Sequence, residues 1–230
     1  MLDEDSSSSN QETGWRTGSL TPIFYHPAED GIIEAETYRL ELILGPMFGG
    51  KTTELLRRVR DRSRYQPNIL CVNTNNDTRY GEHGIITHDK ITFPAERVKD
   101  LYDLLEFDTY KMAPVVAIDE GNHFDEIFDF VTHQLEVTKK TFIISGLQGD
   151  KDKKLFGSLH RLIPHAEELT FLKPFCTSCA NGTKASFSID VVKFCGQIKI
   201  GSDDAFKSVC RRCYGRIRMT QSVEATRKSI

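Results

Sequence analysis

The fold of this chain is decided by the stretch Leu40-Glu41-Leu42-Ile43-Leu44-Gly45-Pro46-Met47-Phe48-Gly49-Gly50-Lys51-Thr52. Leucines at every second position of its first part indicate a β-strand that runs into a glycine-rich turn at Gly45. A helix is expected over residues 52–64, because Leu55, Leu56 and Val59 have the spacing of one helical face. The stretch therefore predicts a strand, a tight turn and a helix in direct succession.

The turn from Gly45 to Thr52 fits the Walker A pattern in full. Its glycines allow the backbone to curl so that several N–H groups point inward at an anion, and the positive end of the helix dipole adds to their field. We expect Lys51 to reach the β- and γ-phosphates of ATP and Thr52 to ligate Mg²⁺. A turn that only links strand to helix is the alternative, but both flanking elements lie where phosphate binding requires them. The predicted ATP-binding loop consists of Gly45, Pro46, Met47, Phe48, Gly49, Gly50, Lys51 and Thr52.

The rest of the main body alternates between two kinds of apolar pattern. Continuous apolar runs at residues 69–72, 115–118 and 142–147 are typical of buried parallel strands. Apolar residues with helical spacing occur between or beside them, at residues 98–105 and 127–135. This alternation predicts an α/β fold of the P-loop NTPase type, in which helices flank a parallel sheet on both faces.

A second candidate element follows the apolar run 115–118, which ends in Asp119 and Glu120. An apolar strand that ends in an acid is the Walker B arrangement, so we expect Asp119 to hold Mg²⁺, directly or through water. Successive side chains at a strand end point in different directions, which leaves Glu120 available for another task. It could activate water, as in an ATPase, or accept a proton from a substrate hydroxyl, as in a kinase. The acid alone does not decide between the two.

Two Cys-x-x-Cys pairs, Cys176 with Cys179 and Cys210 with Cys213, are separated by 30 residues. Four thiolates can close a tetrahedral site around structural zinc, with no open position for catalysis. A redox pair is the alternative for one such motif, but two copies in a short segment favour metal. The segment between the pairs has few apolar residues, so we expect zinc binding to supply folding free energy on the order of 10 kcal/mol. Cys71 lies in an apolar run and is interpreted as a core residue.

The composition of the 230 residues is that of a soluble globular protein, with 39% hydrophobic and 27% charged residues. The net charge of −3 gives no electrostatic reason to expect DNA, RNA or an anionic membrane as a partner. No segment approaches the ~20 apolar residues that span a bilayer, and the polar, acidic N-terminus lacks the order of a secretory signal. We therefore expect a cytoplasmic protein whose six cysteines bind metal or stay free thiols.

Four segments are expected along the chain, and they span residues 1–37, 38–172, 173–215 and 216–230. The first is rich in Ser, Asn, Glu and Gly and is interpreted as a disordered or loosely attached N-terminal tail. The second is the ATP-binding domain. The third is the small zinc-binding lobe, with short strands expected at residues 185–192 and 194–200. The last segment is expected to be a frayed C-terminal tail.

Several further motifs accompany these features between Tyr38 and Tyr214. The set comprises Leu44-Gly45-Pro46-Met47-Phe48-Gly49-Gly50-Lys51-Thr52-Thr53-Glu54-Leu55, Asp77-Thr78-Arg79-Tyr80, Thr87-His88-Asp89, Asp119-Glu120-Gly121, Gly146-Leu147, Phe156-Gly157 and Val209-Cys210-Arg211-Arg212-Cys213. In this order the set resembles the type II thymidine kinase family, whereas a Walker A motif alone would indicate only a superfamily. The resemblance implies ATP-dependent phosphorylation of the 5′-hydroxyl of a deoxynucleoside, thymidine above all, in the salvage of DNA precursors. It also implies a homotetramer that is inhibited by thymidine triphosphate (dTTP).

The resemblance further implies roles for single residues. Glu120 is the expected general base on the 5′-hydroxyl, and Asp77, Arg79 and Asn122 join the expected ATP and Mg²⁺ site. Met47 is expected near the methyl group of the base. A loop of the zinc lobe, the lasso, is expected to cover the nucleoside and exclude water, which favours transfer to the sugar over hydrolysis. The expected substrate-binding residues are Met47, His123, Leu147, Lys151, Phe156, Gln197, Ile198, Lys199, Ile200, Gly201 and Phe206.

Five positions depart from the family pattern. His123 and Lys151 stand in place of aromatic residues, Phe206 replaces a tyrosine, Ser202 replaces a glycine, and Asp190 lies where a basic residue is common. Most of them belong to the expected nucleoside pocket, while the ATP side is intact. Drift at tolerant positions and altered specificity both account for this. Two other functions therefore stay open, namely a P-loop ATPase and a nucleotide-binding regulator without turnover.

Overall fold

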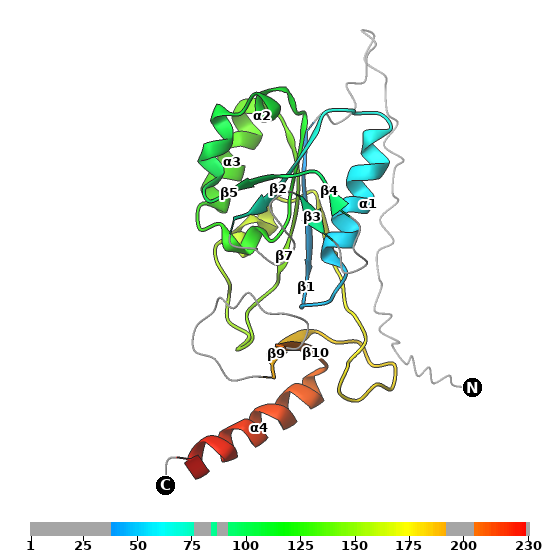
Figure 1. The fold of residues 1–230 in the computed structure, drawn as a ribbon, viewed down its shortest axis with the longest axis vertical. Helices are drawn as coiled ribbons and strands as arrows, with labels where there is room; N and C mark the ends of the chain where they lie inside the picture. Colours follow the sequence, from blue (N-terminus) through cyan, green and yellow to red (C-terminus); the bar gives the residue numbers. More distant parts are fainter. Residues whose placement is uncertain (1–37, 76–83, 87–91, 192–204, 229–230) are drawn as a thin grey trace, which may run out of the picture. The chain divides into compact units, whose positions relative to one another are not determined.

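A parallel sheet of six strands is the centre of the computed structural model, which describes residues 38–75, 84–86, 92–191 and 205–228 (Figure 1). The strands are, in spatial order, β5 (Glu96–Val98), β2 (Ile69–Thr74), β6 (Val115–Ile118), β7 (Thr141–Leu147), β1 (Leu40–Gly45) and β8 (Glu168–Phe171). Every pairing within this sheet is parallel. The four strands that the apolar runs predict are therefore confirmed, and β5 and β8 are added to them.

Helices cover both faces of the sheet, as the alternating pattern predicts. The helix α1 (Lys51–Ser63) packs on one face. The other face is covered by the 3₁₀ helices η1 (Leu101–Glu106) and η3 (Leu159–His165) and by the α-helices α2 (Asp108–Met112) and α3 (Ile127–Thr138). Because successive strand residues point to opposite faces, neighbours in β6 divide between the two cores. Val115 and Ala117 belong to the core beneath α1, and Val116 and Ile118 belong to the other.

The sheet brings the two predicted nucleotide-binding elements to the same edge. The glycine-rich turn follows β1, and Asp119 and Glu120 follow β6. Parallel strands have their carboxyl ends at one edge, and only β7 lies between β1 and β6. In open parallel sheets the crevice outside these ends is where ligands bind. The topology therefore makes this edge the place to look for a site.

A smaller antiparallel pair forms the C-terminal lobe. It consists of β9 (Phe187–Asp190) and β10 (Phe206–Val209), and the helix α4 (Arg211–Lys228) follows it directly. A separate apolar core joins these elements, with Ile189, Val209 and Tyr214 among its members. A further short pair, β3 (Ile85–Ile86) with β4 (Thr92–Phe93), lies beside β2. The strand predicted at 185–192 is confirmed over β9, and the one predicted at 194–200 lies outside the described residues.

Two sequence-based expectations are wrong. Val98 was expected in a helix but ends β5, and the helix begins only at Leu101, where the Asp100 side chain caps it by accepting from the backbone N–H of Tyr102 at 2.8 Å. The tail expected to fray from residue 216 is helical as far as Lys228. That helix has no clear apolar stripe, so hydrophobic periodicity gave no sign of it.

All described residues belong to one unit, Glu36–Ile230. The predicted division between an ATP-binding domain and a zinc lobe at residue 172 therefore stays a prediction. Within the described part of the chain, no helix has both the length and the apolar character needed to cross a membrane.

Candidate active site

The turn between β1 and α1 depends on its glycines and on the chain that follows β8. A side chain at Gly45 would place its Cβ 2.6 Å from the Leu172 carbonyl oxygen. Gly50 has a φ of +80°, a conformation that glycine adopts without strain. Lys51, the first residue of α1, is buried, and its Nζ donates to the Pro46 carbonyl oxygen at 3.0 Å. The lysine ammonium group thus lies against the turn whose backbone N–H groups are expected to bind phosphate.

Asp119 is the buried acid of the site. The Thr52 hydroxyl donates to it at 3.0 Å, and the Ser145 hydroxyl donates to its other carboxylate oxygen. The pKa of Asp119 is raised to about 6, mainly by burial and in addition by the charge of Glu120. The hydrogen bonds from Ser145 and Thr52 and the charge of Lys51 lower this pKa but do not cancel the rise. A carboxylate and a hydroxyl oxygen are donors that Mg²⁺ prefers. The pair therefore fits a magnesium ion, because a bound cation would offset the cost of burying the charge.

Glu120 occupies the point where the chain leaves β6. Its φ of 53° and ψ of 40° are left-handed, a conformation that costs a non-glycine residue roughly 1–2 kcal/mol. Strain of this kind is concentrated at functional sites, where the surrounding structure holds it. The Glu120 carboxylate lies 3.8 Å from Nε2 of His123, whose ring meets the Phe156 ring edge-on at 5.2 Å between centroids. The predicted base and two predicted pocket residues therefore lie together.

Asn122 connects three parts of this edge. Its side-chain oxygen accepts from the backbone N–H of Leu147 at 2.8 Å, which ties the 3₁₀ helix η2 (Gly121–His123) to the end of β7. A side chain at Gly146 would clash with Asn122 and with Leu159, and one at Gly157 would lie 2.7 Å from the Asn122 carbonyl oxygen. Asn122 was expected at the ATP and Mg²⁺ site, and in the structure its amide oxygen holds the backbone that carries Leu147.

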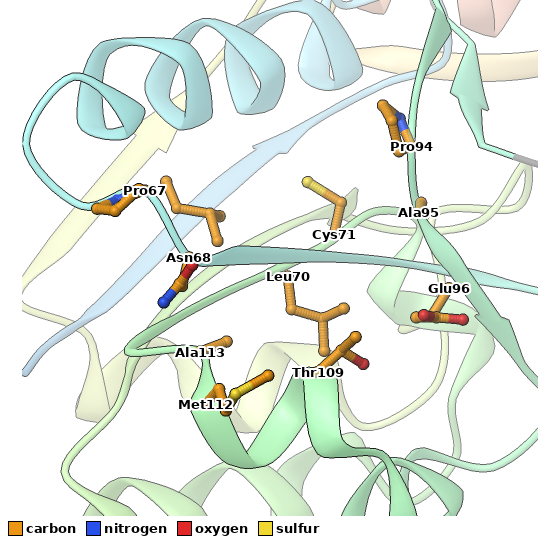
Figure 2. Close-up of a pocket in the computed structure, with 11 residues that line it drawn as sticks. Pro67, Asn68, Leu70, Cys71, Pro94, Ala95, Glu96, Thr109, Met112 and Ala113 are labelled. Atoms are coloured by element: carbon orange, nitrogen blue, oxygen red, sulfur yellow. The ribbon is translucent and has the colours of Figure 1, made fainter.

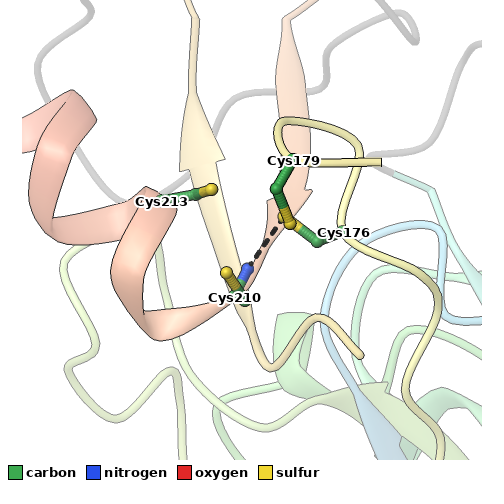
Figure 3. A group of neighbouring side chains, drawn as sticks. All are labelled: Cys176, Cys179, Cys210 and Cys213. Carbon is green, nitrogen blue, oxygen red and sulfur yellow. Dashed lines mark hydrogen bonds between the residues drawn. The ribbon is translucent and has the colours of Figure 1, made fainter. Parts of the chain in front are cut away.

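The four cysteines of the two Cys-x-x-Cys pairs come together in the lobe (Figure 3). Their sulfur atoms lie within 4.8 Å of one another, and the backbone N–H of Cys210 donates to the sulfur of Cys176 at 3.3 Å. Burial opposes ionisation of Cys176, but backbone N–H groups, that of Cys179 foremost, lower its pKa to about 6. Four converging thiols with one already favoured as thiolate are the donor set of structural zinc. The predicted metal ligands Cys176, Cys179, Cys210 and Cys213 therefore form one compact cluster that fits zinc.

Met47 joins the glycine-rich turn between β1 and α1 to the lobe by two hydrogen bonds. Its backbone N–H donates to the hydroxyl of Ser188 at 2.9 Å, and its carbonyl oxygen accepts from the hydroxyl of Ser208. The two serines are buried cross-strand neighbours in β9 and β10. The pair thus satisfies both polar groups of Met47, so the position of the turn depends on the lobe. Sequence reasoning missed both serines, because nothing distinguishes their hydroxyls from those of surface serines.

Two of the apolar residues predicted for the nucleoside pocket, Leu147 and Phe156, lie at the same edge of the sheet. Leu147 and Phe156 line a cavity of about 530 Å³ at the carboxyl ends of β1 and β7, together with Phe187 of the lobe. Glu120 does not line this cavity, so the structure does not place the base and these two residues around one closed space. Phe206 is buried in β10, opposite Asp190 in the pair with β9.

A second cavity, of about 490 Å³, lies at the opposite edge of the sheet (Figure 2). It is lined by residues at the amino ends of β2 and β5 and by α2, among them Leu70, Glu96 and Met112. None of the predicted site residues within the described part of the chain lines it. It is therefore distinct from the candidate site.

Part of the predicted site lies outside the described residues. It comprises Asp77, Arg79, Gln197, Ile198, Lys199, Ile200 and Gly201, together with Ser202 among the departures from the family pattern.

Comparison with known proteins gives a family for this arrangement. The profile of the family described as "Thymidine kinase" matches residues 38–214. The chain belongs to the thymidine kinase family. It is 36% identical over 208 residues to "Thymidine kinase, cytosolic" of Gallus gallus, which covers 88% of this chain and 87% of the chicken protein. It is 37% identical over 175 residues to the thymidine kinase of Raccoon poxvirus (76% and 96%) and 34% identical over 194 residues to that of Oryza sativa subsp. japonica (82% and 69%).

Membership of the thymidine kinase family confirms the resemblance on which the single-residue roles rest, while those roles stay predictions. The matched region contains the glycine-rich turn, both acids after β6 and all four cysteines of the cluster. It ends at Tyr214, so most of α4 lies beyond the part of the chain that defines the family.

Proposed function

We propose that this chain transfers the γ-phosphoryl group of ATP to the 5′-hydroxyl of thymidine. One observation carries the proposal. The strained acid Glu120 directly follows Asp119, which is hydrogen-bonded to Thr52 of the phosphate-binding turn. An acid that could deprotonate an acceptor is thereby placed beside the group that would anchor the nucleotide. Membership of the thymidine kinase family gives the acceptor, a deoxynucleoside.

The proposed chemistry needs little covalent participation by the protein. Glu120 accepts the proton of the 5′-hydroxyl as its oxygen forms a bond to the γ-phosphorus, and the bond from that phosphorus to the β-phosphate oxygen breaks to release ADP. Lys51 and the N-terminus of α1 stabilise negative charge on the phosphates. Thr52 and Asp119 would hold Mg²⁺, which when bound neutralises charge on the phosphate oxygens.

Two departures from the family pattern on the expected nucleoside side, His123 and Lys151, have contacts that bear on the substrate. His123 keeps an edge-on contact with Phe156, so its ring still provides an aromatic surface. The Lys151 ammonium group is 2.9 Å from the carboxylate of Asp152, which places its charge in an ion pair. The first observation supports an aromatic surface for a base, and the second shows that the charge of Lys151 is paired. They favour drift over a change of substrate class.

The zinc cluster supports a structural role in this reaction. Cys210 directly follows β10, and the antiparallel pair of β9 and β10 supplies the two serines that bind Met47. Zinc bound to the four thiolates would fix this pair of strands and thereby the turn. It would take no part in the chemistry, because a closed tetrahedral site has no open position.

A kinase assay across the natural deoxynucleosides with Mg·ATP tests the proposal. We expect the highest kcat/KM with thymidine, and we expect Glu120→Gln to lower kcat by about 10²- to 10⁴-fold, the usual contribution of a general base. Glu136→Gln, on the exposed surface of α3, serves as the matched control and should behave as wild type. Nucleoside-independent ATP turnover would instead support a P-loop ATPase. ATP binding without turnover on any nucleoside would support a regulator.

Three properties implied by the family belong to the same proposal. They are a homotetrameric assembly, feedback inhibition by dTTP and a cytoplasmic location in the salvage of DNA precursors. Sedimentation of the purified protein tests the first, and inhibition kinetics with dTTP test the second. Nucleic acid and membranes are not expected as partners, in line with the net charge of −3.

A further inference from the structure

The helix α4 reaches back from the C-terminal end to a loop of the main body. Its residue Arg218 donates through Nη2 to the carbonyl oxygen of Lys151 at 2.6 Å and to the carboxylate of Asp152 at 2.6 Å. Its Nη1 donates to the carboxylate of Asp190 in β9 at 3.1 Å. One turn earlier, the Tyr214 hydroxyl donates to the same Lys151 carbonyl oxygen at 2.9 Å. Two side chains of α4 therefore hold one peptide carbonyl of the loop.

The loop that α4 holds, residues 149–154, is built to be rigid at its base. The Asp150 carboxylate accepts from the backbone N–H groups of Asp152 and Lys154, both at 2.8 Å. The backbone N–H of Asp150 in turn donates to the carbonyl oxygen of Lys154 at 2.9 Å. Asp150 is buried, so the hydrogen bonds that its carboxylate accepts inside the loop are shielded from water. Its outer side, at Lys151, is the part that α4 fixes.

The position of this loop matters for the candidate pocket. It connects Leu147, at the end of β7, with Phe156, and both of these residues line the same cavity. The resemblance to type II thymidine kinases places Lys151 beside the base. A displacement of the loop would therefore move the pocket wall on which a nucleoside is expected to rest.

The charges of the two residues give this contact a physical basis. Asp190 lies where the family commonly has a basic residue, and it is buried. An unpaired buried carboxylate is costly, and Arg218 supplies the positive partner. Arg218 lies beyond residue 214, where the family match ends. The unusual acid and its partner from the extension are thus complementary.

We propose that Arg218 and Tyr214 are positioning residues for nucleoside binding, through which the C-terminal helix α4 sets the position of the 149–154 loop. The inference rests on the proposed function for the identity of the ligand. It assigns α4 the task of holding one wall of the pocket, and it gives the departure at Asp190 a physical reason.

The test uses the full-length chain with Arg218→Met, which keeps the aliphatic stem and removes the guanidinium group. We expect the KM for thymidine to rise about tenfold with the KM for ATP unchanged, since hydrogen bonds to charged groups typically contribute this much. Amide hydrogen exchange of residues 152–154 should accelerate by a similar factor. Tyr214→Phe, which removes one hydroxyl, should raise the KM for thymidine about threefold. Met219→Ala, at the exposed neighbour of Arg218, is the matched control and should change neither quantity.

Several results would overturn the inference. One is an unchanged KM for thymidine in both variants while bound zinc and the thermal midpoint stay at wild-type values. Another is an equal rise in both KM values, which would mean a general loss of structure. A wild-type protein without nucleoside kinase activity would refute the proposed function instead. In that case the exchange rates of residues 152–154 still decide whether Arg218 orders the loop.

Discussion

Replacement of Asp119 by asparagine should stabilise the magnesium-free fold at neutral pH while it removes kinase activity. Burial is the main reason that the pKa of Asp119 rises from 3.8 to about 6. At about 1.36 kcal/mol per pKa unit, this difference corresponds to about 3 kcal/mol of unfolding free energy at pH 7. Asparagine has nearly the same shape and its amide oxygen can still accept from Ser145 or Thr52, but it carries no charge. We therefore expect the variant to be more stable by up to about 3 kcal/mol.

The sign of the pH dependence follows from the same pKa. The folded protein binds the Asp119 proton more tightly than the unfolded chain does, so the penalty is absent below pH 3.8. It grows as the pH rises through the interval from 3.8 to about 6 and is constant above that. The stability difference between Asp119→Asn and wild type should therefore increase through this interval and then level off.

Denaturant unfolding between pH 4 and 8 measures this difference, in magnesium-free buffer without a chelator because a chelator would also remove zinc. Asp129→Asn, an exposed acid on α3, is the control and should change stability by less than about 0.5 kcal/mol at every pH. Mg·ATP should raise the stability of wild type but not of Asp119→Asn. If Asp119→Asn is less stable than wild type at pH 7, or if the difference does not vary with pH, then the hydrogen bonds to the carboxylate outweigh its burial and the reasoning is wrong.

Three further substitutions test other parts of the site. Cys210→Ser should abolish stoichiometric zinc binding, measured by atomic absorption, and nucleoside binding, while most of the far-UV circular dichroism is retained; wild-type activity in a zinc-free protein would contradict this. Ser208→Ala removes the donor to the Met47 carbonyl oxygen and should raise the KM for ATP several-fold, at a stability cost of about 1 kcal/mol. An unchanged KM would show that this hydrogen bond is not needed for ATP binding. Gly157→Ala forces a side chain into a φ of +62° and against the Asn122 carbonyl oxygen, so thermal unfolding should show a loss of at least 1–3 kcal/mol.

The sheet and the glycine-rich turn between β1 and α1 could be predicted because their signals are local. A buried parallel strand is a short apolar run, and a Walker A turn needs glycines at fixed places. The local sequence of residues 40–52 and 115–120 was therefore sufficient to predict their secondary structure. The cysteine pairs were predictable for a similar reason, since metal coordination fixes both residue type and spacing. In each case the chemistry restricts which residues can occur.

The contacts that join the parts of the site were not predictable in this way. Ser188 and Ser208 matter because β9 and β10 place them opposite each other and against Met47, and no local pattern records that register. Arg218 meets Lys151 across 67 positions of the sequence, in a helix with no clear apolar stripe. Pairwise polar contacts between distant segments depend on the finished fold, and a single sequence gives no sign of them.

Asp119 and Glu120 are neighbours that each lower the stability of the fold, and their position explains why the fold tolerates them. Asp119 would gain stability from losing its charge, and Glu120 would gain it from losing its side chain, since glycine adopts a φ of 53° without cost. Both lie at the carboxyl end of β6, between two cores that pack that strand from either face. A strand held this firmly can carry an unfavourable charge and an unfavourable backbone conformation at its end without unfolding there. Bound magnesium nucleotide would offset the first, and the packing of β6 between the two cores offsets the second.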